Sequence, residues 1–350
     1  MHRLHSKDTW RKAFGIVRPM SDFESLLKMP KVELHVHLEG SIRPETLLKL
    51  ARRNDIELPA SDLEGLRQWY SFQSFRHFVE VYVAISKCLK TPEDLELVAR
   101  EFLEGQAEQN IIHTEATFTA ATIETHVGIP FEEQMSALRS AVDYGHDVLG
   151  ISCSFILDIV RGMSVERANE VAKWCVDHHH DGVCALGIAG EEHLGTAIYQ
   201  EAFDIARKNG VPVIAHAGET CGPEVIWDSL KYADSVRIGH GVRCLEDPKL
   251  VEHLRERQTP LEVCPSSNVC LGVFPSWEEH PLKKLIDAGL YVTLNSDDPP
   301  MFNTTLTQEF EHACNTFGFS LDDCRELSRR AAAASLLPNE NKARLIEAMA

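Results

Sequence analysis

Apolar residues alternate with other residues from Val32 to Leu38, in the stretch VELHVHL. Alternation with a period of two, together with β-branched residues, predicts a β-strand. Residues two apart on a strand face the same side of the sheet, so His35 and His37 present two imidazoles together. Histidine is the commonest metal ligand, and two imidazoles on one face can share one divalent ion. The alternative interpretation is a pair of half-buried strand histidines.

Seven further segments are predicted as strands: Ile111–Phe118, Ile151–Ile159, Val183–Ile188, Val211–His216, Val236–His240, Leu261–Cys264 and Tyr291–Asn295. Helical patterns lie between most of them: Ser164–His178, Thr196–Lys208, Pro248–Arg257 and Pro281–Ala288. Alternation of strands and helices implies parallel pairing, and eight such units predict a single (β/α)₈ TIM-like barrel of the α/β class. The alternative is a doubly wound parallel sheet, but no glycine-rich nucleotide-binding motif follows any of the strands.

Extra helices are expected after the first strand and at the C-terminus. A helix is predicted over Ser41–Asn54, residues 55–109 are largely helical in pattern, and residues 320–350 form a helical tail. No linker rich in proline, glycine or serine divides the chain, so we expect one barrel domain over residues 31–350. Residues 1–30 are polar and mixed, and they are predicted to be an N-terminal extension that packs on this domain.

Composition and net charge indicate which kinds of molecule the protein is expected to bind. The 350 residues carry a formal net charge of −18. A surface of this sign repels phosphates, so we expect no binding to nucleic acid or to anionic membranes. The ten cysteines form no CxxC pair, and the sequence has neither an apolar leader nor 18 consecutive apolar residues. We therefore expect a cytoplasmic protein that acts on a small molecule, and the sequence leaves its oligomeric state open.

Ionisable residues follow several of the predicted strands, where a barrel places its active site. His216 ends the fifth strand and Asp297 follows the eighth, so both are expected beside His35 and His37. Three imidazoles and one carboxylate suit a catalytic Zn²⁺ ion, one per chain, with an open position for water. Zinc lowers the pKa of a bound water to about 7, which makes hydroxide available at neutral pH.

Three more residues at these strand ends are candidates for catalysis and binding. Glu219 lies three residues after His216 and could serve as a general acid or base. His240 ends the sixth strand and could orient or deprotonate the attacking water. Asp298 is adjacent to Asp297 and is free to hold a donor group of the substrate.

The motifs HVHLEG, AGEE, HAGE, RIGHG, CPSSN and NSDDP together resemble those of the adenosine deaminase family, within the metal-dependent amidohydrolase superfamily. They occur in family order between residues 32 and 310. The resemblance implies a (β/α)₈ barrel with one zinc ion, and the absence of a lysine at the end of the fourth strand favours a mononuclear site. The implied zinc ligands are His35, His37, His216 and Asp297.

The resemblance also implies roles toward the substrate. Glu219 would protonate the purine N1, and His240 would position the attacking water. Asp298 would bond to N7, and the backbone N–H of Gly190 would donate to N3. Phe75 belongs to a run of phenylalanines at helical spacing, which would form a helix that covers the purine pocket; the alternative is that these rings pack in the core.

One position departs from the family pattern. Adenosine deaminases have Asp two residues after the second histidine, where it contacts the ribose 5′-hydroxyl, whereas this chain has Glu39. We expect Glu39 to face the pocket mouth, on the strand face of His35 and His37. Similar HxHxEG forms occur among adenine deaminases and aminodeoxyfutalosine deaminases.

The stretch SDDPPMFNTTL has the Phe-x-x-Thr-Leu form that is typical of the nucleoside enzymes. We therefore expect zinc-dependent hydrolytic deamination of a 6-aminopurine nucleoside such as adenosine, with adenine or aminodeoxyfutalosine as the alternative substrate. Another mononuclear zinc hydrolase on the same barrel and a non-catalytic paralogue are less favoured interpretations, because every expected ligand and Glu219 are present.

Overall fold

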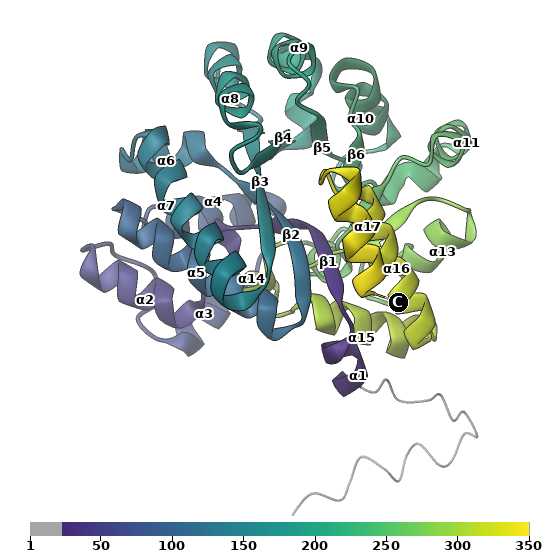
Figure 1. The fold of residues 1–350 in the computed structure, drawn as a ribbon, viewed down its shortest axis with the longest axis horizontal. Helices are drawn as coiled ribbons and strands as arrows, with labels where there is room; N and C mark the ends of the chain where they lie inside the picture. The colour runs from purple at the N-terminus through teal and green to yellow at the C-terminus, as the bar shows by residue number, and fades with distance from the viewer. Residues whose placement is uncertain (1–22, 350) are drawn as a thin grey trace, which may run out of the picture.

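The computed structural model describes residues 23–349 of the chain. Eight strands form one sheet in the order β1 to β8, and every neighbouring pair along this order is parallel. Figure 1 shows the strands at the centre with helices around them, so the predicted barrel is confirmed. The strands are β1 (Lys31–His37), β2 (Ile111–Phe118), β3 (Ser152–Val160), β4 (Val183–Ala189), β5 (Val213–Ala217), β6 (Arg237–His240), β7 (Leu261–Val263) and β8 (Val292–Leu294).

Helices connect the strands and cover the outside of the barrel (Figure 1). Within residues 23–349, every helix is too short or too polar to span a bilayer. After α1 (Phe23–Lys28), the main helices are η2 (Glu39–Ser41), α2 (Pro44–Arg53), α3 (Leu63–Trp69), α4 (Phe75–Ser86), α5 (Pro92–Glu108), α6 (Ala120–Val127), α7 (Phe131–Tyr144), α8 (Val165–His178), α9 (Gln200–Lys208), α10 (Pro223–Asp228), α11 (Pro248–Arg257), α12 (Pro265–Cys270), α13 (Leu282–Asp287), α14 (Pro299–Phe302), α15 (Leu306–Phe317), α16 (Leu321–Ala334) and α17 (Asn339–Ala348).

The barrel closes between β1 and β8 without a regular ladder. The backbone N–H of His37 donates to the carbonyl of Asp297 at 2.9 Å, and the N–H of Asp297 donates to the carbonyl of His35 at 3.1 Å. The side chain of Asn295 completes the seam, because its Oδ1 accepts from the backbone N–H groups of Leu34 and His35 at 3.0 and 3.1 Å. The first and last strands are therefore joined beside the histidines of β1.

The end of the barrel opposite the strand C-termini is filled by the segment that follows α16. Leu336 packs against Ile156 and Ile214 inside the barrel. The Arg237 guanidinium donates from Nη1 to the carbonyl of Ala334 at 3.0 Å. These contacts fix the C-terminal helices against the barrel, as Figure 1 shows for α16 beside β1.

Most predicted elements occur where the sequence placed them, and β2 and α11 have the predicted bounds. The helix predicted from Ser41 begins at Pro44, because Ser41 belongs to η2 and proline favours the first helical turn. The helical tail is two helices, since the chain becomes extended before Pro338. Residues 1–22 of the predicted N-terminal extension lie outside the described residues, so a division at residue 30 stays a prediction.

Candidate active site

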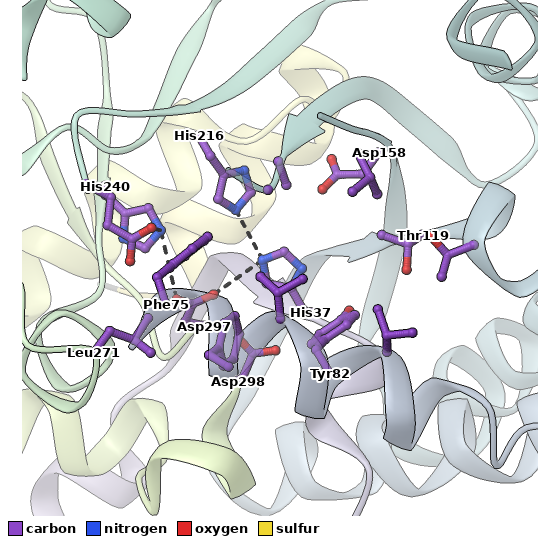
Figure 2. Close-up of a pocket in the computed structure, with 18 residues that line it drawn as sticks. His37, Phe75, Tyr82, Thr119, Asp158, His216, His240, Leu271, Asp297 and Asp298 are labelled. Carbon is purple, nitrogen blue, oxygen red and sulfur yellow. Dashed lines mark hydrogen bonds and ion pairs between the residues drawn. The ribbon is translucent and has the colours of Figure 1, made fainter. Parts of the chain in front are cut away.

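A pocket lies at the C-terminal ends of the strands, where barrel enzymes carry their active sites. Figure 2 shows the side chains that line it converging from the strand ends and from α4. All but two of the predicted site residues line the pocket; His35 lies below its floor and Glu39 behind its wall. The lining residues are His37, Phe75, Phe78, Val79, Tyr82, Val83, Thr119, Thr122, Asp158, Val160, Ala189, Gly190, His216, Glu219, His240, Leu271, Asp297 and Asp298.

The donor atoms of the four predicted metal ligands converge at the floor of this pocket. Nε2 of His37 lies 3.2 Å from Nε2 of His216 and 3.3 Å from Oδ1 of Asp297. Nε2 of His35 lies 3.5 Å from the same carboxylate oxygen. Ligands of a tetrahedral zinc ion lie roughly 3.3–3.4 Å apart, because each bond is about 2.0–2.1 Å long. These three separations are therefore close to those expected between ligands of one divalent ion.

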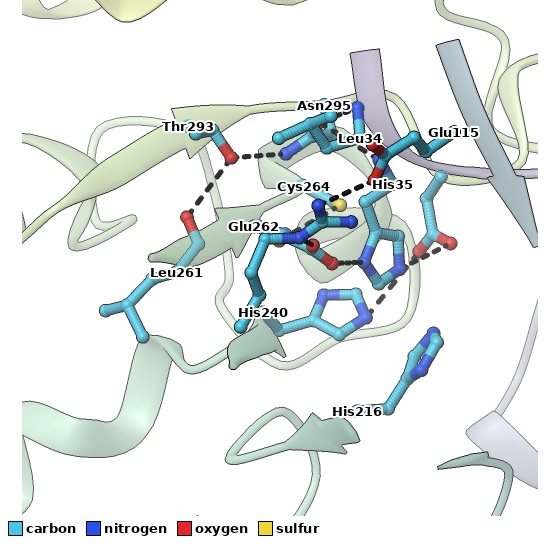
Figure 3. Close-up of polar contacts among 12 residues, drawn as sticks. Leu34, His35, Glu115, His216, His240, Leu261, Glu262, Cys264, Thr293 and Asn295 are labelled. Carbon is cyan, nitrogen blue, oxygen red and sulfur yellow. Dashed lines mark hydrogen bonds and ion pairs between the residues drawn. The ribbon is translucent and has the colours of Figure 1, made fainter. Parts of the chain in front are cut away.

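Hydrogen bonds on the far side of two rings leave the facing nitrogens free for an ion. Nδ1 of His35 lies 2.9 Å from the carboxylate of Glu262, and Nε2 of His35 is buried without a hydrogen-bond partner in residues 23–349 (Figure 3). Nδ1 of His216 donates to the carbonyl of Ile188 at 3.2 Å. A metal-binding histidine is oriented in this way, with one nitrogen donating outward and the other facing the metal.

The charges around these rings favour a bound cation. Burial lowers the pKa of His35, but Asp297 and Glu262 outweigh burial and raise it to about 10. Burial and the neighbouring His35 and His37 lower the pKa of His216 well below its usual value. The carboxylates therefore attract positive charge, either as a proton on His35 or as a metal ion, and metal binding would release that proton.

Unusual backbone conformations place His240 and Asp297. Their φ angles are 60° and 65°, in the left-handed region that residues with side chains seldom adopt. Each such residue costs about 1–3 kcal/mol, and these conformations concentrate at functional sites. Gly239 lies between β5 and the ring of His35. A Cβ added to Gly239 would lie 2.8 Å from Cε1 of His35, so only glycine lets the backbone of β6 come this close to the ring.

A chain of hydrogen bonds fixes the protonation of His240. The backbone N–H of Leu282 donates to Nδ1 of His280 at 3.2 Å, so His280 carries its proton on Nε2. That nitrogen donates to Oδ1 of Asn268 at 3.1 Å, and Nδ2 of Asn268 donates to Nδ1 of His240 at 3.3 Å. Burial lowers the pKa of both histidines to about 3. His240 is therefore neutral, with its proton on Nε2, 3.7 Å from Glu219.

The carboxylate of Glu192 holds the loop that carries Glu219. It accepts hydrogen bonds from the backbone N–H groups of Glu219, Thr220 and Cys221 at 3.0, 3.1 and 2.6 Å. Burial, with the charges of Asp297 and Glu192, raises the pKa of Glu219 well above its usual range. The raised pKa favours the protonated carboxyl group, which can give a proton to a bound molecule.

Glycine residues make room for the polar groups on two other sides of the pocket. A Cβ added to Gly40 would lie 1.6 Å from Oδ1 of Asp298, so a side chain at this position would displace the carboxyl group. That oxygen has no hydrogen-bond partner in the described part of the chain. Gly190 has a φ of 88°, which glycine adopts at little cost. Its position beside Val160 leaves it at the pocket wall.

The expectation that Glu39 faces the pocket mouth is wrong. Strand β1 ends at His37 and the chain turns into η2, so the alternation of the strand stops before Glu39. Glu39 is 0% exposed, and its carboxylate accepts from the backbone N–H and hydroxyl of Thr119 and, at 3.0 Å, from the hydroxyl of Tyr82. Thr119 and Tyr82 line the pocket (Figure 2), and their hydrogen bonds hold Glu39 behind them.

Helix α4 covers one wall of the pocket. Phe75, Phe78 and Tyr82 lie along the face that lines it. Phe72 instead packs edge-to-face against Phe78 and Phe302, with ring centroids 5.4 and 5.8 Å apart. Both interpretations of the phenylalanine run therefore hold, each for different rings. Phe75 lines the pocket, whereas Phe72 packs against other aromatic rings at the edge of the core.

The residues that orient the site were not predicted from the sequence. They are Glu262 behind His35, Glu192 behind Glu219, and the pair Asn268 and His280 behind His240. Glu192 and Asn268 lie within recognised motifs, but those motifs do not show which group each residue contacts. A signal was available for Glu262, because a single acidic residue within an apolar strand requires a buried partner.

A profile of the adenosine deaminase family matches residues 30–350. The chain belongs to the adenosine deaminase family. It is 38% identical to an adenine deaminase of Crocosphaera subtropica, over 91% of this chain and 97% of that protein. The crystal structure of an adenine deaminase from Arthrobacter aurescens has a TM-score of 0.87 at 32% identity, over 92% of this chain and 98% of that one. The Arabidopsis N6-mAMP deaminase has a TM-score of 0.84 at 26% identity, over 93% and 99%.

Membership in the adenosine deaminase family makes the protein a hydrolytic purine deaminase, which confirms the predicted class of enzyme. The pocket described above contains groups that suit such a reaction: a cluster of candidate metal ligands, a carboxyl group with a raised pKa, and a neutral histidine with a proton to donate. Within residues 23–349, the side chains spaced to hold a metal ion are those of His35, His37, His216, His240 and Asp297, described above, and the buried thiol of Cys264.

Proposed function

We propose that the protein is a zinc-dependent adenine deaminase that converts adenine and water to hypoxanthine and ammonia. The observation that carries this proposal is the position of Glu39. The carboxylate that would meet a ribose 5′-hydroxyl is fully buried, and Thr119 and Tyr82 already donate to both of its oxygens. A nucleoside would therefore find no free acceptor there. The names of the similar proteins from Crocosphaera and Arthrobacter point to the same substrate.

This proposal replaces the nucleoside expected from the Phe-x-x-Thr-Leu stretch. That stretch lies at α14 and α15, where Thr305 caps α15 by accepting from the backbone N–H of Gln308. Its threonine therefore has a structural role that does not depend on a sugar. A nucleotide such as the substrate in the name of the Arabidopsis relative is also disfavoured, because no lysine or arginine is among the described residues that line the pocket.

The zinc ion is part of the same proposal. His35, His37, His216 and Asp297 would hold one ion per chain, since facing donor atoms among them lie 3.2–3.5 Å apart and the far nitrogens of His35 and His216 are already bonded. When bound, such an ion lowers the pKa of water so that hydroxide is available near neutral pH. Elemental analysis should find one zinc per chain, and His216→Ala should remove it. Two tightly bound ions per chain would contradict this site.

In this proposal, Glu219 and His240 have different roles toward the protons of the reaction. Glu219, protonated because it is buried among carboxylates, donates to N1 of the purine and makes C6 more electrophilic. His240 presents the proton on Nε2 to the oxygen of the attacking water and thereby orients it. Asp298 and the backbone of Gly190 fix the ring through N7 and N3. Water adds its oxygen to C6; one of its protons restores Glu219 and the other passes to the amino group. The C6–N6 bond then breaks, ammonia leaves, and N1 keeps the proton that Glu219 donated.

The test compares the steady-state kinetics of adenine, adenosine and aminodeoxyfutalosine as substrates. Turnover is measured by the loss of purine absorbance and by the release of ammonia. We expect kcat/KM for adenine to exceed that for either nucleoside by at least about 10²-fold, because the pocket has no free group for the sugar. A kcat/KM for adenosine equal to or above that for adenine would overturn the assignment and restore the nucleoside interpretation.

A further inference from the structure

Asp158 is a buried acid that none of the roles above uses. It lies near the C-terminal end of β3, is 1% exposed and lines the pocket. Neither of its carboxylate oxygens has a hydrogen-bond partner within residues 23–349. An unpaired buried carboxylate destabilises a folded protein, so its presence calls for a ligand that pairs with it. Burial raises the pKa of Asp158 to about 7, although His37 and His35 act in the opposite direction.

The neighbouring strand is shaped to admit this carboxylate. Asp158 pairs in register with Gly187 of β4. A Cβ added to Gly187 would lie 1.8 Å from Oδ1 of Asp158, and Gly187 is not in the left-handed region. Glycine is therefore needed at this position for space and not for its backbone angle. The acid at position 158 and the glycine at position 187 form a complementary pair.

The position of Asp158 relates it to one atom of the purine. Figure 2 shows Asp158 on the side of the pocket opposite His240 and Leu271. It is two residues before Val160, which packs against Gly190. With N1 at Glu219, N7 at Asp298 and N3 at Gly190, the remaining ring nitrogen is N9, which is separated from N3 by one carbon. In adenine this nitrogen can carry a hydrogen, whereas in nucleosides it carries the sugar.

We infer that Asp158 accepts a hydrogen bond from N9–H of the free base and thereby selects adenine over purines substituted at N9. This inference rests on the proposed function and names the group that determines specificity at that site. A charged acceptor forms a stronger hydrogen bond than a neutral one. A substrate without the donor leaves the carboxylate unpaired and buried, which is why sites of this kind discriminate strongly.

The experiment compares adenine with 9-methyladenine, which has no N9–H, in the wild type, Asp158→Asn and Asp158→Ala. Asparagine keeps the volume and an acceptor oxygen but loses the charge, and alanine loses both. We expect kcat/KM for adenine to fall about 10-fold in Asp158→Asn and at least about 10²-fold in Asp158→Ala. The value for 9-methyladenine should stay within about threefold or rise, so that the preference for adenine collapses.

A second variant and a melting curve separate binding from folding. Gly187→Ala keeps the acid but displaces it, and it should reproduce the loss of preference. Both Asp158 variants should melt, without ligand, at or above the wild-type temperature, because the substitutions remove an unpaired buried acid.

Equal losses for both substrates, or an unchanged preference in Asp158→Ala, would overturn the inference while leaving adenine deamination intact. Adenosine is assayed in the same variants, and loss of adenosine turnover alone would overturn the inference by showing that Asp158 binds a sugar. A wild type that does not deaminate adenine would overturn the proposed function and this inference together.

Discussion

Oε2 of Glu262 lies 2.9 Å from Nδ1 of His35, while Oε1 of the same carboxylate accepts from Nε of Arg237 at 2.5 Å (Figure 3). Arg237 also pairs with Glu115 at 2.6 Å inside the barrel. One buried carboxylate thus connects the metal ligands to the charged interior. Because the partner of a ligand histidine fixes its orientation, Glu262 influences metal affinity without touching the ion.

Replacing Glu262 by Gln should therefore weaken zinc binding by about 10–100-fold, as measured by competition with a chelator. The matched control is Glu115→Gln, which removes the other carboxylate of Arg237 and does not contact His35. Both variants break a buried ion pair and should lose about 3–5 kcal/mol of unfolding free energy. Equal loss of zinc affinity in the folded forms of the two variants would argue against a role through His35.

Glu219→Gln should lower kcat by at least about 10²–10⁴-fold, because the amide keeps the shape but has no proton to donate to N1. Zinc content should be unchanged, since Glu219 is not among the four ligands. Glu246→Gln is the control, because Glu246 lies in an exposed pair with Arg243 at 2.7 Å. A near-normal kcat in Glu219→Gln would show that the proton comes from another group.

Asn268→Asp should invert the hydrogen bond at Nδ1 of His240. A carboxylate accepts where the amide nitrogen donates, so His240 would hold its proton on Nδ1 and present a lone pair to the pocket. We expect kcat to fall by about 10²-fold or more, with zinc retained. Proton–nitrogen NMR of the histidine rings would report the tautomer directly. A change of tautomer without loss of kcat would exclude His240 as a donor.

Gly40→Ala should lower activity through Asp298. The added Cβ would overlap Oδ1 of Asp298, so the carboxyl group must move away from the position in which it meets N7. We expect a loss in kcat/KM of about 10²-fold or more. Gly105→Ala is the control, because its Cβ would be 3.8 Å from the nearest group, Arg43, and alanine favours a helix. Equal activity of Gly40→Ala and wild type would show that the carboxyl group adapts.

Because His280 is buried, we expect the free energy of unfolding to fall in acid. Its pKa is lowered from 6.5 to about 3 by burial, so between these values the unfolded chain binds a proton that the native protein does not. The free energy of unfolding should therefore fall as the pH drops below 6.5, by up to about 1.4 kcal/mol per pH unit from this group. His280→Gln should reduce that slope in denaturant titrations with a chelator present. An unchanged slope would assign the acid sensitivity to other groups.

The fold was predictable because each strand carries a local signal. Runs such as Val183–Ala189 are apolar, bounded by polar residues and separated by helical patterns, and parallel strands that are buried on both sides need no long-range information to be recognised. The ends of elements were less predictable. The turn at Glu39–Ser41 follows directly on β1, and its residues resemble a continuation of the strand.

The convergence of the four candidate metal ligands was predictable for the same reason, since strand ends gather at one end of a barrel. The groups that orient them were not, because their contacts join distant parts of the chain. Nothing near Glu39 in the sequence indicates that Thr119 and Tyr82 would enclose it. Asp158 offered a signal, as an acid between Leu157 and Ile159 in an apolar strand, but its meaning depends on Gly187 of the next strand.

The seam between β1 and β8 has a consequence for the order of synthesis. His35 and Asn295, which bond across the seam, are 260 positions apart. A ribosome therefore releases the two histidines of β1 long before Asp297 exists, and the nascent chain has only part of the ligand set. Because the barrel and the proposed ligand set are completed by the same segment, the four-ligand site can form only after nearly the whole chain is translated, and truncated products that lack Asp297 cannot hold an ion through all four ligands.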